Sequence, residues 1–127
     1  MKKIETDQAP KAVGPYSQAV MAPPFLFLSG MVAIDPKTGK ITETAIEGQT
    51  RQVLVNIEAV LKAASLSFKD VVRMEVFLKD MAHFQVMNSI YAEKFPHEVK
   101  PARHTVEVAR LPLDALIEIT CTALCKT

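Results

Sequence analysis

The segment from Thr44 to Lys79 reads TAIEGQTRQVLVNIEAVLKAASLSFKDVVRMEVFLK, and it sets a helical repeat directly before a strand repeat. Apolar residues recur at helical intervals, and Thr44 and Glu47 have the spacing of a capping box, so we expect a helix over residues 44–64. Residues 71–79 then alternate between apolar and polar side chains, which predicts a half-buried strand. The predicted buried side carries Val72, Met74, Val76 and Leu78.

Further strand patterns flank this segment on both sides. Before it, short β-rich runs near Ile4 and at residues 16–21, 25–29 and 31–34 are separated by turns rich in Pro and Gly. After it, Asp80 can cap a second helix, which must end by Phe95 because Pro96 follows. Residues 104–109 and 115–124 are again β-like, and the short link between them predicts a hairpin.

These elements predict the α+β class, with a mixed sheet and two helices that cover one of its faces. The chain has 127 residues, which suits a single domain over residues 1–127. Its 49% hydrophobic content is high for a small chain, and the predicted helices leave the second sheet face uncovered. We therefore expect another subunit to cover that face.

Charge and targeting patterns exclude several classes of partner. Fifteen basic and 14 acidic residues give a net charge of +1 without long blocks of one sign, so nucleic acid and anionic membranes are not expected partners. No leader pattern or membrane-length apolar run is visible, which predicts a cytoplasmic protein. Cys121 and Cys125 are expected to be free thiols.

Common cofactor and metal motifs do not fit this sequence. The glycines at positions 14, 30, 39 and 48 match neither the G-x-G-x-x-G dinucleotide-binding pattern nor the G-x-x-x-x-G-K-[ST] phosphate-binding loop. The histidines at positions 83, 97 and 104 lack metal-ligand spacing. We therefore expect no metal site and no nucleotide bound through those loops.

Two charged residues stand out from the strand patterns near the C-terminus. Arg103 lies where a Pro-broken loop enters a strand, and its planar fork can hold a carboxylate with two hydrogen bonds. Glu118 lies between Ile117 and Ile119 in an apolar strand. Spacing alone favours an ordinary surface ion pair for Arg103 and a solvated side chain for Glu118, unless a second subunit buries that face.

The block PARHTVEVARLP at residues 101–112, with IEI at 117–119, resembles the Rid family, the reactive-intermediate deaminases also called the YjgF family. GPYSQAV at 14–20, LSG at 28–30 and VFLKDMAHFQVMNSIYAEKF at 76–95 extend the resemblance over nearly the whole chain. It implies a chorismate-mutase-like subunit in a homotrimer, with cofactor-free active sites between subunits. The deaminase branch hydrolyses 2-iminobutanoate and 2-iminopropanoate, which pyridoxal-phosphate dehydratases release, to 2-keto acids and ammonia.

The resemblance also implies roles for individual residues. Arg103 would clamp the substrate carboxylate, and Glu118 would contact the hydrolytic water as the general acid and base. The other pocket positions would be Tyr16, Gly30, Asn88 and Thr105, with Gly30 acting through its backbone and Thr105 through its backbone N–H. His104 stands where relatives usually carry a small residue, and this larger side chain could narrow the substrate range. Thr105 stands where many relatives carry cysteine, which argues against an essential thiol.

Two other functions remain open at this point. A non-catalytic, regulatory trimer could use Arg103 to bind a small carboxylate or keto acid without turnover. A nuclease or translation-inhibitor function has been attached to some relatives. The balanced charge and the lack of a basic aromatic surface argue against that second alternative.

Overall fold

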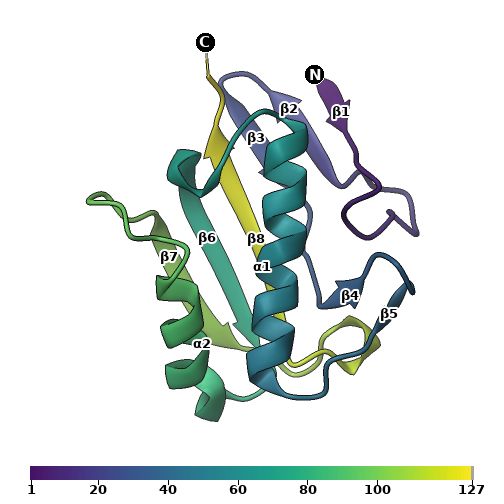
Figure 1. Cartoon of the computed structure of the whole chain (residues 1–127), viewed down its shortest axis with the longest axis vertical. Coiled ribbons are helices and arrows are strands. Elements are labelled where there is room, and N and C mark those ends of the chain that lie inside the picture. Colours follow the sequence, from purple (N-terminus) through teal and green to yellow (C-terminus); the bar gives the residue numbers. More distant parts are fainter. Residues whose placement is uncertain (127) are drawn as a thin grey trace.

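A computed structural model describes residues 1–126, and its main sheet has six strands in the order β1-β2-β3-β8-β6-β7 (Figure 1). These strands are β1 (Lys2–Ile4), β2 (Ala19–Ala22), β3 (Phe25–Leu28), β6 (Val71–Leu78), β7 (Ala102–Glu107) and β8 (Ile117–Leu124). Adjacent strands run antiparallel, apart from the parallel pair β6 and β7, so the sheet is mixed. A separate ribbon pairs β4 (Ile34–Asp35) with β5 (Lys40–Ile41).

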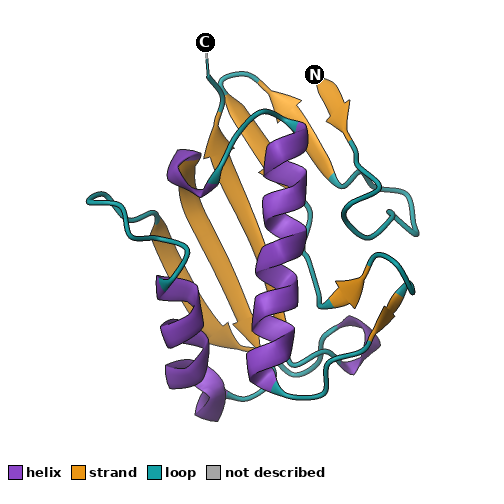
Figure 2. Ribbon diagram, in the orientation of Figure 1, coloured by secondary structure: helices purple, strands orange, loops and turns teal. Residues whose placement is uncertain are grey.

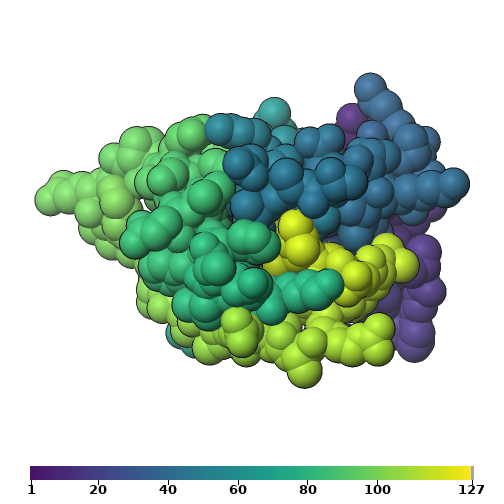
Figure 3. Space-filling model, turned by 90° about the horizontal axis from the view of Figure 1, so that it is seen from below, coloured from purple at the N-terminus to yellow at the C-terminus, as the bar shows by residue number. Residues whose placement is uncertain are grey.

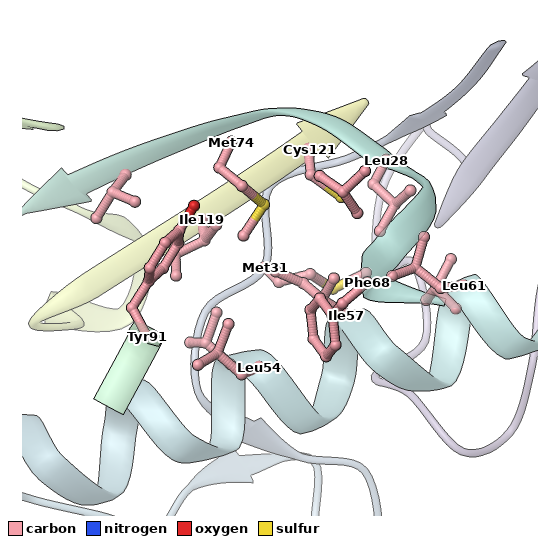
Figure 4. Close-up of a cluster of buried hydrophobic side chains, with 14 of the residues drawn as sticks. Leu28, Met31, Leu54, Ile57, Leu61, Phe68, Met74, Tyr91, Ile119 and Cys121 are labelled. Carbon is pink, nitrogen blue, oxygen red and sulfur yellow. The ribbon is translucent and has the colours of Figure 1, made fainter. Parts of the chain in front are cut away.

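Two helices, α1 (Ile46–Ala63) and α2 (Phe84–Ala92), lie on the same face of the sheet (Figures 1 and 2). Short 3₁₀ turns occupy Phe68–Asp70, Met81–His83 and Pro112–Asp114. The main core fills the layer between helices and sheet, where Leu54 and Ile57 of α1 meet Met74 and Ile119 (Figure 4). This arrangement confirms the predicted α+β class and the placement of both helices on one face.

Within residues 1–126, neither α-helix lies over the opposite face of the sheet. Phe27 is 48% exposed, Val106 42% and Leu124 46%, and strand register puts all three on that open face. Viewed from below, the yellow-green and yellow segment that leads into β8 reaches the surface between α2 in green and the blue β4–β5 region (Figure 3).

The predicted boundaries of several elements were wrong in detail. The strand predicted over residues 16–21 begins only at Ala19, and Met31 forms an isolated bridge to Ile119 instead of starting a strand. The capping box was also wrong, because the N-cap is Ala45 without a side-chain cap. Tertiary hydrogen bonds from Gln49 fix the helix start instead: its Nε2 donates to the Glu43 carbonyl at 2.9 Å, and its Oε1 accepts the Leu116 N–H at 2.9 Å.

Other local predictions can be checked directly. Asp80 was predicted to cap the second helix, but it caps the 3₁₀ turn that leads into α2, where its carboxylate accepts the Ala82 N–H at 2.8 Å. The N-cap of α2 itself is His83. The predicted burial of Val72 was wrong. Its side chain is 40% exposed, because a register irregularity between Val71 and Arg73 turns it out of the core. The two cysteines are free thiols, as expected.

The predicted hairpin between the last two strands was wrong. β6 lies between β7 and β8, pairing with β7 in parallel and with β8 antiparallel. Residues 71–107 thus form a strand–helix–strand unit in which α2 makes the crossover that a parallel pair requires. Arg103 and Glu118 are therefore two strands apart.

Candidate functional site

Glu118 lies on the open face of the sheet. Its neighbours Ile117 and Ile119 are buried under the helices, so the alternation of β8 turns the half-buried Glu118 side chain the other way. The Met31 N–H donates to the Ile119 carbonyl at 2.8 Å, and the Ile119 N–H donates back at 3.0 Å. This bridge holds Gly30 against Glu118.

Gly30 leaves the space that the Glu118 carboxyl occupies. A Cβ added at Gly30 would lie 2.9 Å from Glu118 Cδ and 3.1 and 3.2 Å from its two oxygens. These separations are below the optimal carbon–carbon contact of about 3.5–4.0 Å. Any side chain at position 30 would therefore push the carboxyl out of its place.

The environment of Glu118 favours the protonated carboxyl. Burial raises the pKa of Glu118 above its ordinary value. The ion pairs formed within residues 1–126 do not include it, so no bound cation counteracts that rise. Burial thus shifts the pKa of Glu118 in the direction that suits a carboxyl that must both accept and return a proton.

Glu118 borders a pocket of about 480 Å³, a volume within the range of small-molecule sites. Its polar lining comes from Lys11, Tyr16, Gln18, Ser29, Gly30 and Glu118, and its apolar lining from Pro10, Val13, Met31, Val32, Ile34, Pro112 and Leu113. Gln18, buried beneath the N-terminal loop, donates to the carbonyls of Pro10 at 2.7 Å and Thr6 at 3.1 Å. These bonds fix the loop that carries Tyr16 at the rim.

Arg103 lies on the helix-covered side of the sheet. It pairs in register with the buried Met74, and its guanidinium carbon lies 4.7 Å from the ring centroid of Tyr91 and 5.8 Å from that of Phe84, both on α2. Register places Thr105 on the same side of β7, and its hydroxyl is buried without a hydrogen-bond partner among residues 1–126.

Asn88 belongs beside Arg103 by helical spacing. It stands four residues after Phe84 and three before Tyr91, so the three share one face of α2. The predicted site residues consequently fall into two groups: the Glu118 group (Tyr16, Gly30 and Glu118) and the Arg103 group (Asn88, Arg103 and Thr105). One subunit brings together the members of each group, but it holds the two groups on opposite faces of its sheet.

Sequence patterns did not single out the two aromatic residues beside Arg103. Phe84 and Tyr91 were not among the predicted site residues, although their helical spacing from Asn88 is visible in the sequence. His104 points to the open face, where its Nδ1 lies 3.1 Å from Arg73 Nη2 and its Nε2 lies 3.8 Å from Glu75 Oε1. It is therefore separated from the Arg103 group of its own subunit.

Comparison with known proteins identifies the family. Residues 6–125 match the family model described as endoribonuclease L-PSP. The chain belongs to this family. Its relatives in the L-PSP family include the Reactive Intermediate Deaminase A of Arabidopsis thaliana, 47% identical over 120 residues, or 94% of this chain and 64% of that protein. The resemblance to Rid proteins is thereby confirmed.

Other L-PSP family members match over almost their full length. A RutC family protein of Pyrococcus horikoshii is 57% identical over 120 residues, covering 94% of each chain. The solved structure of Escherichia coli TdcF with bound serine has a TM-score of 0.94 at 38% identity, covering 99% of this chain and 100% of that one. The fold and the family thus agree.

Metal-binding clusters and membrane-spanning helices are both lacking from the part of the chain that the structure describes. Among residues 1–126, no cluster of three His, Cys, Asp or Glu side chains could hold a metal ion. No helix in that range is long and apolar enough to cross a membrane.

Proposed function

We propose that this protein hydrolyses 2-imino acids such as 2-iminobutanoate and 2-iminopropanoate to 2-keto acids and ammonia. The active sites would lie between subunits of a homotrimer, each joining the Glu118 group of one subunit to the Arg103 group of the next. The observation that carries this proposal is the separation of the two groups onto opposite faces of one sheet. Each group is an incomplete site alone.

The open sheet face supports assembly. Phe27, Val106 and Leu124 leave apolar surface on a face without a helical cover, and a second copy of the chain would bury it. An interface that repeats head to tail around a closed ring brings different patches of two subunits together at every contact. Such contacts are what a site shared between the Glu118 and Arg103 groups needs.

The chemistry proposed for the shared site begins with orientation. Arg103 would hold the substrate carboxylate through two parallel hydrogen bonds, with the Thr105 N–H and the Asn88 side chain beside it. Fixing the carboxylate places C2 of the protonated imine next to Glu118, and such positioning can supply part of the roughly 7–11 kcal/mol available from proximity.

Hydrolysis then requires one water and one proton relay. Glu118 would take a proton from water while the oxygen bonds to C2 and the C=N electrons move to nitrogen. Glu118 then returns that proton to the amine nitrogen of the carbinolamine, and the C–N bond breaks so that ammonia leaves. As the carbonyl forms, the carbinolamine hydroxyl gives its proton to the Glu118 carboxylate, which passes it to solvent. General acid and base catalysis of this kind is worth about 10²–10⁴-fold, which suits a reaction that is already fast in water.

The names of relatives support this assignment. The Arabidopsis relative is named a reactive intermediate deaminase, and TdcF was solved with serine, a small amino acid whose carboxylate resembles that of the proposed substrate. The family model's description names an endoribonuclease instead. The lining of the Glu118 pocket within residues 1–126 includes a single basic residue, Lys11, which does not suit a polyanionic strand.

The proposed function also implies a compartment and partners for the protein. It would act without a cofactor in the cytoplasm, consistent with two free thiols, and would consume imines released by pyridoxal-phosphate dehydratases. Its partners would be these small imino acids and two further copies of the chain, with no role for nucleic acid or membrane.

A coupled assay tests the activity. A threonine dehydratase generates 2-iminobutanoate in situ, and its conversion to 2-ketobutyrate is followed spectroscopically. We expect acceleration by the parent, none by Arg103→Ala, and parental rates for Arg110→Ala, a matched change at an exposed arginine seven residues later. A folded parent that binds 2-ketobutyrate but does not accelerate imine decay would instead support the non-catalytic carboxylate-binding function.

A further inference from the structure

The Arg103 side chain is held by aromatic rings instead of by an acid. Its guanidinium carbon lies 4.7 Å from the centroid of Tyr91 and 5.8 Å from that of Phe84. The ion pairs within residues 1–126 do not include Arg103. A cation over the face of an aromatic ring is attracted by the negative ring face.

This mode of support leaves the arginine ready to bind an anion. The five N–H donors of a guanidinium lie in its plane, so a ring stacked on the face uses none of them. A carboxylate partner within the subunit would occupy the same donors and compete with a substrate carboxylate. The two rings therefore hold the guanidinium without a carboxylate partner among residues 1–126 that would compete for its donors.

Tyr91 is itself firmly anchored. It is 8% exposed and stacks on Phe95 with centroids 4.7 Å apart and planes at 29°, and Phe95 meets Phe68 edge-on at 5.3 Å. Burial raises the pKa of Tyr91 to about 12, against the opposing effect of Arg103, so the phenol stays neutral at physiological pH. The Tyr91 hydroxyl is buried without a hydrogen bond of ordinary geometry among residues 1–126, and the Arg103 guanidinium lies near that hydroxyl as well as near the ring.

We propose that Tyr91 is a positioning residue, whose ring holds the Arg103 guanidinium in place for carboxylate recognition, with Phe84 as the second ring. This inference rests on the proposed function for its catalytic consequence. The stacking itself can be measured without turnover.

The test compares Tyr91→Phe, which keeps the ring, with Tyr91→Leu, which removes it. We expect Tyr91→Phe to retain the parental KM for 2-iminobutanoate and Tyr91→Leu to raise KM roughly 5- to 30-fold with little change in kcat. Phe68→Leu is the matched control, because it removes a ring that packs on Phe95, one ring further from Arg103 than Tyr91.

A second readout is the NMR chemical shift of the Arg103 side-chain protons, which ring currents should move upfield in the parent and in Tyr91→Phe. An unchanged shift in Tyr91→Leu, or an equal rise in KM for Tyr91→Leu and Phe68→Leu, would overturn the positioning role. If the parent shows the ring-current shift, Tyr91→Leu loses it, and the parent does not hydrolyse the imine, the proposed function fails while the positioning of Arg103 by Tyr91 stands.

Discussion

Replacing Gly30 with alanine would test whether the position of the Glu118 carboxyl matters. Gly30 does not adopt the positive φ that disfavours alanine, whereas Gly39 does, at φ 74°. The backbone therefore accepts alanine at position 30, and the conflict is with Glu118, whose Cδ would lie 2.9 Å from the new methyl group. Restoring an ordinary contact of about 3.5–4.0 Å moves the carboxyl by roughly 0.5–1 Å.

A displacement of that size predicts a specific kinetic result. Misplacing a reacting group by about 1 Å can cost on the order of 100-fold, so we expect kcat for 2-iminobutanoate to fall roughly 10- to 100-fold in Gly30→Ala. The free energy of unfolding should change by less than about 1 kcal/mol, because alanine reduces the entropy of the unfolded chain and offsets part of the local strain. Imine decay and urea unfolding measure the two effects.

The control for Gly30→Ala is Gly39→Ala. No atom lies within 4 Å of a Cβ built at Gly39, but its left-handed backbone should cost roughly 1–2 kcal/mol of stability with kcat unchanged. The reasoning is refuted if a folded Gly30→Ala variant keeps the parental kcat. It is also refuted if Gly30→Ala lowers the residual rate of Glu118→Ala by the same factor as it lowers the parent's, since the clash requires the carboxylate.

Three further outcomes follow from the same geometry. Two variants, Arg103→Ala and Glu118→Ala, are refolded together in equal amounts. The mixture should regain about one quarter of the parental activity, because one interface in four then has both groups intact. No recovery would place the site within one subunit. The free energy of unfolding of Glu118→Gln should rise relative to that of the parent as pH increases from about 4 to neutrality. The pKa of Glu118 is raised in the folded protein, so ionisation of this carboxyl destabilises the folded parent above the unfolded-state pKa. Urea titrations that give the same stability difference at both ends of this range would contradict this sign. Phe27→Asp places a charge on the open face and should shift sedimentation from trimer to monomer while the circular dichroism stays unchanged.

The first helix was predictable because its apolar repeat is long. Residues 44–64 were expected to be helical and α1 covers Ile46–Ala63. The cap was not predictable, because the hydrogen bonds of Gln49 at the helix start reach the Glu43 carbonyl and the Leu116 N–H, and Leu116 is 67 residues away along the chain. A partner so distant leaves no local pattern at Thr44.

Strand order was less accessible than strand position. The link after β7 is short enough for a hairpin, and this local cue outweighed the strand–helix–strand order of residues 71–107, which favours a parallel pair. The chain from Val108 to Leu116 instead crosses the end of β6, where the Val108 N–H donates to the Leu78 carbonyl at 2.9 Å and the Lys79 N–H donates to the Leu116 carbonyl at 3.0 Å. Link length alone could not distinguish adjacent strands from strands one apart.

The sequence predicts the sheet face of Glu118 but not that of Arg103. Ile117 and Ile119 flank Glu118, so alternation alone turns Glu118 away from the core, and the structure agrees. The edge strand β7 has no such alternation, since Arg103, His104 and Thr105 are all partly exposed, and only its register with Met74 shows that Arg103 turns toward α2.

This difference in orientation has a consequence for activity. Arg103 cannot reach Glu118 of its own subunit, because β6 separates their strands and their side chains leave the sheet on opposite sides. A packed sheet does not bend to bring its two faces together. If both residues act on one substrate, the second must come from another copy of the chain. Catalysis would then depend on assembly, and the apolar open face that drives assembly would be as necessary to the reaction as either charged residue.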